Sequence, residues 1–317
     1  MNTGHRLAVA YGEELLKYDF GGDHPMRSVR IAEFFRLCRE DGLLDDPRVK
    51  VIEPRAATMD DLLLFHTASY IERVKELSDI GTGMLDEGDT PVFSGVYEAA
   101  CYTVGTTLEC LKDSLSHHTC SFNPMGGLHH ARRDRAAGFC VFNDVAVAIE
   151  YSRRRLGIRR ILYIDIDAHH GDGVMYEYYN DKDLRILDFH EDGRYLYPGT
   201  GSEFETGGPA AEGSKMNVKL QPGSTDKQFE ARLKGATRFL AESDPELVIL
   251  QAGADCLAGD PIAHLSFSPR VHSLVAGVAK KAADRAARGS LLALGGGGYD
   301  PQNTANAWLC LLRGFLS

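Results

Sequence analysis

One stretch of the sequence, Arg160-Ile-Leu-Tyr-Ile-Asp-Ile-Asp-Ala-His-His-Gly-Asp-Gly173, limits the possible folds and functions more than any other. It begins as an apolar run that is typical of a strand buried on both faces of a parallel sheet. The run then leads into five ionisable side chains, Asp165, Asp167, His169, His170 and Asp172. Unpaired charges are costly to bury, so this density favours a bound metal ion over a strand end with solvated acids. Asp167 and His169 are two residues apart, which places both side chains on one side of an extended backbone.

The chain around this stretch alternates between apolar strands and helices. Strands are expected at 7–11, 49–52, 160–166, 184–190, 215–220, 247–252 and 290–295. Ser28, Thr58 and Asn143 are expected to begin helices, and residues 92–115 to form one long helix. Further helices are expected near 224–242, 269–288 and 303–316. This alternation predicts a mainly parallel sheet with helices on both faces. Because no linker or repeat interrupts it, we expect a single domain over residues 1–317.

Composition and charge exclude several classes of protein. The chain has 317 residues, of which 44% are hydrophobic and 25% charged, so it has ample material for a core. Its net charge of -10 argues against a nucleic-acid-binding protein, which needs a basic surface. No apolar run approaches the length of a membrane span, and the N-terminus has no apolar signal core. The seven cysteines have no repeated spacing and resemble reduced thiols, so we expect a cytoplasmic protein.

A third candidate metal ligand, Asp255, follows the strand expected at 247–252. Functional residues of a parallel sheet gather beyond the carboxyl ends of its strands, so Asp255 is expected near Asp167. Two aspartates and one histidine leave room for water and a substrate oxygen on the metal. This set suits Zn²⁺, and such sites also accept Fe²⁺, Mn²⁺ or Co²⁺. Taken alone, Asp255 would be interpreted as a loop acid or a helix cap.

A tandem histidine, His129-His130, follows two glycines between the long helix and the central strand. Asp165 and Asp172 remain once the metal ligands are assigned. Each of these acids is placed to orient one imidazole, raising its basicity and fixing its tautomer.

Three other motifs are candidates for a functional role. The pair His117-His118 lacks neighbouring glycines and matching acids, and is interpreted as solvated surface. Cys140 is interpreted as a pocket wall, because a metal site needs no thiolate nucleophile. The turn Gly295-Gly-Gly-Gly-Tyr299 lacks the continuation of a phosphate-binding loop. It would instead let the backbone approach a ligand and let Tyr299 donate to a developing oxyanion.

Together these motifs resemble the zinc-dependent histone deacetylase family, including its bacterial acetoin-utilisation and acetylpolyamine-hydrolase members. The resemblance covers nearly the whole chain and follows the family's order of motifs: Asp23-His24-Pro25, Gly127-Leu-His-His-Ala131, Gly138-Phe-Cys140, the stretch from Asp165 to Gly173, Tyr197-Pro-Gly-Thr-Gly201, Gly253-Ala-Asp255 and the turn ending at Tyr299. By this likeness the fold is an arginase/deacetylase-like three-layer αβα sandwich with a mainly parallel central sheet of about eight strands.

The resemblance implies a role for each of these residues. The metal ligands would be Asp167, His169 and Asp255. The catalytic residues would be His130 as general base and acid, its orienting partner Asp172, the electrostatic histidine His129 with its partner Asp165, and Tyr299, which polarises the scissile carbonyl. The residues of the acyl-lysine tunnel would be the walls Gly138, Phe139 and Tyr197, the rim residue Asp89, and Arg27 in an inner acetate channel. In this mechanism the metal acidifies water, His130 takes the water proton, and Tyr299 stabilises the tetrahedral oxyanion.

The same comparison bears on the number and kind of metals. Arginase-like ureohydrolases share this fold and need two metals, but Gly171 and Leu257 stand where they require carboxylates, so one catalytic metal is expected. Family members often have a serine, where this chain has Asp188, that helps to hold a structural potassium. The resemblance therefore implies a K⁺ or Na⁺ site formed by Asp165, Asp167, His169, Asp188 and Phe189. Asp188 is expected to supply a full negative charge to it.

We expect a metal-dependent amidohydrolase that removes an acetyl or other short acyl group from acyl-lysine in proteins or peptides. The compact run from Leu77 to Pro91 has no room for the insertion of polyamine hydrolases, which disfavours the alternative of a small acetylated polyamine as substrate. A catalytically silent acyl-lysine-binding protein is the alternative from another class, and the complete set of catalytic residues disfavours it. No nucleic-acid or membrane partner is expected, and the acyl chain and oligomeric state are left open.

Overall fold

The computed structural model describes residues 5–317, which are built around one β-sheet. Within these residues the sheet has eight strands in the order β2-β1-β3-β8-β7-β4-β5-β6, and all neighbouring strands are parallel. The strands are β1 (Leu7–Ala10), β2 (Val49–Ile52), β3 (Cys120–Asn123), β4 (Ile161–Asp165), β5 (Leu184–Glu191), β6 (Lys215–Leu220), β7 (Leu247–Gln251) and β8 (Leu291–Leu294). The predicted parallel sheet of about eight strands is confirmed.

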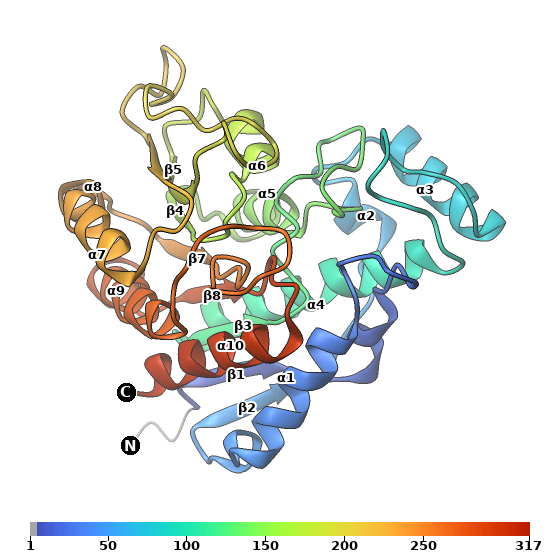
Figure 1. Cartoon of the computed structure of the whole chain (residues 1–317), viewed down its shortest axis with the longest axis horizontal. Coiled ribbons are helices and arrows are strands. Elements are labelled where there is room, and N and C mark those ends of the chain that lie inside the picture. The colour runs from blue at the N-terminus through green and yellow to red at the C-terminus, as the bar shows by residue number, and fades with distance from the viewer. Residues whose placement is uncertain (1–4) are drawn as a thin grey trace.

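Helices connect the strands on both faces of the sheet. The α-helices are α1 (Val29–Glu40), α2 (Met59–Leu62), α3 (Ala68–Ile80), α4 (Val96–His117), α5 (Asp144–Leu156), α6 (Asp172–Glu177), α7 (Asp226–Gly235), α8 (Thr237–Glu242), α9 (Arg270–Ala286) and α10 (Pro301–Leu316), and two short 3-10 helices are η1 (Glu13–Lys17) and η2 (Leu43–Asp45). Helices α1, α9 and α10 pack together on one face, and α4 with α5 on the other (Figure 1). The result is a three-layer αβα sandwich.

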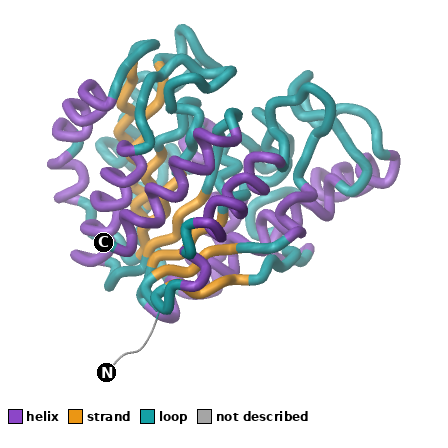
Figure 2. The backbone as a smooth tube through the Cα atoms, turned by 60° about the horizontal axis from the view of Figure 1, so that its bottom comes forward, coloured by secondary structure: helices purple, strands orange, loops and turns teal. Residues whose placement is uncertain are grey.

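The long loops gather at one end of the strands (Figure 2). They follow the carboxyl ends of β3, β4, β5, β7 and β8, and in a parallel sheet all of these ends lie at the same edge. The register aligns Asp165, the last residue of β4, with Gln251 of β7 on one side and Asp188 of β5 on the other. The fold therefore brings the loops that carry the predicted site residues to one edge of the sheet.

The hydrophobic core packs against the strands that lead to this edge of the sheet. All residues of β4, β7 and β8 are buried, as the apolar runs predicted. Trp308 of α10 packs edge-on against Phe34 of α1 and Phe122 of β3, with ring centroids 5.6 and 5.8 Å away. Its indole N–H donates to the carbonyl oxygen of Ala252 at 3.0 Å. Helix α10 is thus tied to the start of the loop that carries Asp255.

All three predicted helix starts are confirmed in position. Thr58 forms a capping box with Asp61, and the side chain of Asn143 accepts a hydrogen bond from the backbone N–H of Ala146. At Ser28 the position of the helix start is confirmed, but the capping hydrogen bond is not formed. Helix α1 does begin after Ser28, but the Ser28 hydroxyl donates to Asp19 at 2.6 Å and does not cap the helix.

Other element boundaries also differ from the prediction. The long helix begins at Val96 and not at residue 92, because Gly95 adopts a left-handed conformation immediately before it. The helix expected at 224–242 is divided at Ala236 into α7 and α8. Strand β3 was not predicted, since its four residues, Cys-Ser-Phe-Asn, include two polar side chains and show no clear apolar run.

No helix within residues 5–317 is both long and apolar enough to cross a membrane. All seven cysteines lie in this part of the chain, and each is a free thiol. Cys140 is buried, with its sulfur 3.2 Å from the carbonyl oxygen of Gly138, which agrees with its interpretation as part of a wall.

Candidate active site

The three predicted metal ligands meet beyond the ends of β4 and β7. Asp167, His169 and Asp255 are buried, and one ligand atom from each lies within 4.8 Å of the others. The Nδ1 atom of His169 is 2.8 Å from an Asp255 oxygen and 3.1 Å from an Asp167 oxygen. Among the residues that the structure describes, this is the one group of three such side chains close enough to share a metal ion.

The crowding of two carboxylates makes this cluster suited to a cation. Burial and the neighbouring Asp167 carboxylate raise the pKa of Asp255 to about 8. Two like charges in a buried site oppose each other's ionisation, and a cation between them removes this conflict. The residues therefore fit a divalent metal. Two carboxylates and one imidazole suit Zn²⁺, and also Fe²⁺, Mn²⁺ or Co²⁺.

The glycine-rich turn after β8 lies directly against these ligands. The backbone N–H of Gly297 donates to an Asp167 oxygen at 2.8 Å. A Cβ atom on Gly297 would lie 2.2 Å from an Asp255 oxygen, closer than any side chain could tolerate. Gly298, with φ of 124°, then turns the chain toward Tyr299. The glycines are thus needed for close approach to the metal ligands and not for phosphate binding.

The tandem histidines form two Asp–His pairs beside the ligands. His129 Nδ1 lies 2.8 Å from Asp165, and His130 Nδ1 lies 2.7 Å from Asp172, as predicted. The two Nε2 atoms are 3.1 Å apart, so one imidazole must donate to the other. Arg132 donates a second hydrogen bond to Asp172 at 2.8 Å and fixes that carboxylate.

The pKa values of the two histidines are shifted in opposite directions. Burial opposes the charge of His129, but the carboxylates of Asp165 and Asp167 outweigh it and raise the His129 pKa to about 10. Burial and the neighbouring His129 lower the pKa of His130 to about 4, against the effect of Asp172. His129 is therefore a cation near neutral pH, whereas His130 is neutral and its Nε2 lone pair accepts the hydrogen bond from His129 Nε2–H.

Tyr299 stands at the end of the glycine turn. Its backbone N–H donates to Asp260 at 2.9 Å, and its ring lies edge-on to Phe139, with centroids 5.8 Å apart. Burial and the nearby Asp255 and Asp167 carboxylates raise the pKa of Tyr299 well above that of a free tyrosine. The hydroxyl is therefore protonated and available as a hydrogen-bond donor.

The position of Arg27 does not support the role predicted for it. Its side chain is 40% exposed and pairs with Asp19 at 2.8 Å on the surface. The buried arginine is Arg30, which donates to the carbonyl oxygens of Gly296 and Gly298 at 2.7 and 3.3 Å. Arg30 lies inside α1, on the face that is turned to the core. The sequence signal for Arg30 is its position next to the apolar Ile31, three residues after Arg27.

The predicted wall residues surround the approach to the histidines. The ring of Tyr197 lies 5.2 Å from that of His130 and 6.4 Å from that of His169. A Cβ atom on Gly138 would lie 2.5 Å from the His130 ring and 3.0 Å from Tyr197, so the wall has no room for a side chain there. Gly138 and Phe139 both have positive φ, 54° and 67°, which presents the Phe139 ring toward Tyr299.

Asp89 lies at the mouth of this approach. It lines a cavity of about 730 Å³ together with Tyr197, Glu87 and Arg135. The Thr90 hydroxyl is 3.1 Å from both Asp89 Oδ1 and the backbone nitrogen of Phe139, and joins the rim to the wall. Burial and the neighbouring Asp86 carboxylate raise the pKa of Asp89 to about 6.

The predicted K⁺ or Na⁺ site does not fit the surroundings of Asp188. One Asp188 oxygen is 2.7 Å from His190 Nδ1, and the other accepts the Gly171 N–H at 2.9 Å. The second His190 nitrogen faces the carbonyl oxygen of Gly201 at 3.0 Å, so both ring nitrogens must donate and His190 is an imidazolium. Burial opposes this charge, but Asp188 raises the His190 pKa. The charge of Asp188 is thus balanced by His190, and the ring of Phe189 packs on Phe229.

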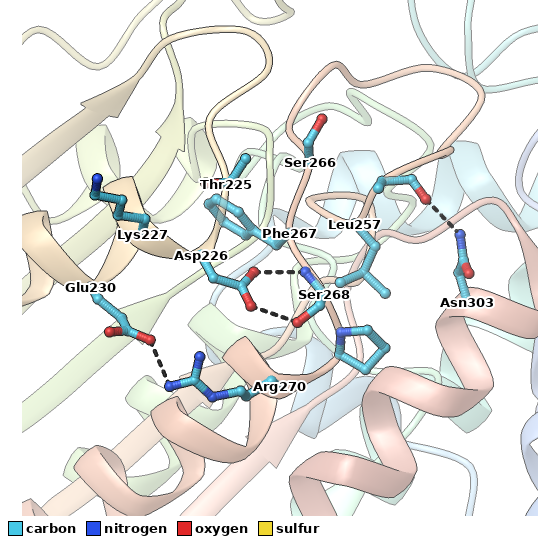
Figure 3. Close-up of a pocket in the computed structure, with 12 residues that line it drawn as sticks. Thr225, Asp226, Lys227, Glu230, Leu257, Ser266, Phe267, Ser268, Arg270 and Asn303 are labelled. Carbon is cyan, nitrogen blue, oxygen red and sulfur yellow. Dashed lines mark hydrogen bonds and ion pairs between the residues drawn. The ribbon is translucent and has the colours of Figure 1, made fainter.

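A separate cavity of about 730 Å³ opens beside α7 (Figure 3). Asp226, Glu230 and Arg270 of its lining are paired with other residues. Asp226 accepts hydrogen bonds from the N–H and the hydroxyl of Ser268 at 2.7 and 2.6 Å, and Glu230 pairs with Arg270 at 2.8 Å. This cavity adds no residue to the predicted site. His117 is exposed and lies outside the predicted site, as expected for a surface residue.

Comparison with known proteins agrees with this geometry. The histone deacetylase domain matches residues 24–315. The chain is similar to the acetoin utilization protein AcuC of Bacillus subtilis strain 168, with 38% identity over 314 residues that cover 94% of this chain and 80% of that protein. It is 32% identical to AcuC of Staphylococcus xylosus over 331 residues, covering 98% of this chain and 84% of that protein.

A solved structure, that of the HDA15 HD domain, has the same fold. It matches with a TM-score of 0.87 and 24% identity, covering 98% of this chain and 90% of that one. The domain match spans most of the chain, and the AcuC proteins are more than 30% identical over nearly all of it. The chain therefore belongs to the histone deacetylase family and is a deacetylase.

Proposed function

We propose that this deacetylase hydrolyses the acyl amide of acyl-lysine in a protein or peptide, with one divalent metal held by Asp167, His169 and Asp255. The observation that carries the proposal is that a proton acceptor and a metal ligand face the same approach. The rings of His130 and His169 are 6.0 Å apart, and Tyr197 lies beside both.

The histidine pair supports a role in proton transfer. When bound, a divalent metal would acidify water and polarise the acyl carbonyl. His130 is neutral and donates from Nδ1 to Asp172, and its Nε2 accepts a hydrogen bond from His129. Once that hydrogen bond opens, Nε2 is the atom that would accept a proton from water and return it to the leaving amine. His129 keeps a positive charge next to it, which favours the negative charge that develops during the reaction.

Tyr299 is proposed to stabilise the tetrahedral oxyanion. Its raised pKa keeps the hydroxyl protonated, and its place after the glycine turn puts it near the metal ligands. A donor that is already in position costs no reorganisation during the reaction. Arg30 holds the carbonyl groups of Gly296 and Gly298, so it would steady the turn from behind.

The mouth supports acyl-lysine in a peptide as substrate. The aromatic walls Phe139 and Tyr197 suit a methylene stem, and the Asp89 carboxylate at the rim would accept hydrogen bonds from backbone N–H groups of a peptide. A small acetylated polyamine has the same acyl amide and stem. It offers no backbone N–H groups, but carries a cation that Asp89 and Glu87 would also attract.

Loss of a ligand should remove the metal and the activity together. Asp167→Asn and His169→Ala are each expected to abolish bound zinc, measured by elemental analysis, and turnover. His117→Ala, which changes an exposed histidine, is the matched control and should retain both. Zinc and turnover at the parent level in either ligand variant would contradict the assignment.

Removal of the Tyr299 hydroxyl should slow the chemical step. Tyr299→Phe is expected to retain metal and fold and to lower kcat by roughly 10²–10³, the usual cost of one oxyanion donor. Tyr195→Phe removes a hydroxyl from a tyrosine that is 54% exposed and should leave kcat unchanged. Equal kcat values for the parent and Tyr299→Phe would exclude Tyr299 from the mechanism.

A substrate panel tests the proposed function itself. The metal-loaded protein should show a higher kcat/KM on acetyl-lysine peptides than on acetylputrescine or acetylcadaverine. The reverse order would establish the polyamine alternative. Tight binding of acetyl-lysine peptides without turnover of any substrate, in protein shown to contain metal, would establish a binding protein instead.

The pKa of Asp89 predicts a pH dependence of peptide binding. Because this pKa is raised to about 6, the carboxyl becomes neutral as the pH falls through that value and accepts hydrogen bonds more weakly. KM for a peptide should then rise about tenfold, the effect of losing a charge-assisted hydrogen bond. The rise should be absent in Asp89→Asn and for a minimal acetyl-lysine amide. Identical pH profiles of KM for the parent and Asp89→Asn would refute this role.

A further inference from the structure

A buried amide, Gln251, touches three of the loops that form the site. It is the last residue of β7 and is fully buried. Its Nε2 atom donates to Asp167 Oδ2 at 2.7 Å and to the carbonyl oxygen of Gly127 at 3.3 Å. Its Oε1 atom accepts the N–H of Gly253 at 2.8 Å. The side chain thus joins the ligand Asp167, the loop before the tandem histidines and the loop that carries Asp255.

The orientation of this amide is determined by its backbone partners. The N–H of Gly253 can only donate, so it must face the amide oxygen. The carbonyl oxygen of Gly127 can only accept, so it must face the amide nitrogen. The N–H group that points to Asp167 is therefore set by two partners that do not titrate.

The space around Gln251 is closed as well. A Cβ atom on Gly296 would lie 2.1 Å from the amide nitrogen, and one on Gly127 would lie 3.1 Å from the side chain. The strand register holds the Gln251 backbone between Asp165 of β4 and Leu294 of β8. Because neighbouring atoms confine both its backbone and its side chain, the Gln251 amide cannot adopt another conformation.

The two oxygens of Asp167 consequently differ. Oδ2 accepts two hydrogen bonds, from Gln251 at 2.7 Å and from the Gly297 N–H at 2.8 Å. Oδ1 accepts the backbone N–H of His169 at 3.0 Å and lies 3.1 Å from Nδ1 of the same residue, the atom that also faces Asp255. Oδ2 is thus held by Gln251 and the glycine turn, whereas Oδ1 is held by His169.

We propose that Gln251 is a positioning residue for the metal centre. It fixes the orientation of the Asp167 carboxylate through Oδ2, and it links that ligand to the backbone before His129 and before Asp255. The proposal rests on the ligand assignment within the proposed function. Groups that hydrogen-bond to metal ligands typically alter metal affinity by about 10–100-fold when they are changed.

The test compares two buried amides at strand ends. Gln251→Met removes the hydrogen bonds with little change in side-chain length. Asn123→Leu is the matched control, because Asn123 is a fully buried amide at the end of β3 that bonds to Thr103, Thr107 and Met125 and to no metal ligand. The measurements are Zn²⁺ affinity of the metal-free protein, by competition with a chelator, and the visible absorption spectrum of the Co²⁺ form.

Gln251→Met should weaken Zn²⁺ binding about 10–100-fold and alter the Co²⁺ spectrum, because Asp167 loses one of the donors that fix its carboxylate. Asn123→Leu should keep the affinity and spectrum of the parent, even if its melting temperature falls. If Gln251→Met does not fold, Gln251→Asn serves instead, since its shorter amide keeps its polarity but does not reach Asp167. An unchanged affinity and spectrum in the folded Gln251 variant, or equal losses in the Asn123 control, would overturn the proposal. A parent that binds no metal would instead refute the ligand assignment.

Discussion

The burial of the carboxylates around the metal ligands and the tandem histidines is the constraint on which the rest of the structure depends. They belong to Asp165, Asp167, Asp172, Asp188 and Asp255, all less than a tenth exposed. A buried carboxylate must be paired, hydrogen-bonded or bound to a metal. Three of them have an imidazole of their own, in the pairs Asp165–His129, Asp172–His130 and Asp188–His190. Asp167 and Asp255 share the single imidazole of His169, and this shortage of positive charge is what suits the site to a metal ion.

The parallel sheet and the glycines make this crowding sterically possible. Adjacent parallel strands deliver loops from distant parts of the chain to one edge, where their side chains meet. The backbone must then pass within contact distance of the carboxylates. A Cβ atom on Gly171 would lie 2.7 Å from Asp165, one on Gly253 would lie 2.3 Å from Asp167, and one on Gly297 would lie 2.2 Å from Asp255. The buried acids therefore require glycines at these positions, because any other side chain would clash with a carboxylate.

Much of the site could be predicted because it follows from general rules. The parallel sheet brings the loops after β4 and β7 to one edge, and with them Asp167, His169 and Asp255. The expected extended backbone at Asp167 and His169 is wrong, because β4 ends at Asp165 and both residues lie in the loop after it. The sequence is less informative where a residue's burial or hydrogen-bond partner depends on the tertiary packing of a single helix or strand end. Arg27 and Arg30 lie three residues apart at the start of α1, and the packing of that helix on the core decides which of them is buried. A single buried amide at the end of an apolar strand, such as Gln251, leaves no pattern to detect.

The three Asp–His pairs have the same chemistry but different surroundings, which separates their roles. The second nitrogen of His190 faces the backbone carbonyl of Gly201, and the residue is fully buried. The His190 ring therefore cannot exchange a proton with a substrate, and its positive charge serves the structure. His129 directs its second nitrogen at His130 and carries a charge that lowers the pKa of that neighbour. Only His130 has its ring beside both Tyr197 and the ligand His169. An aspartate partner by itself therefore does not make a histidine a base; a neutral ring that lies beside the metal ligands and the tunnel wall is suited to that role.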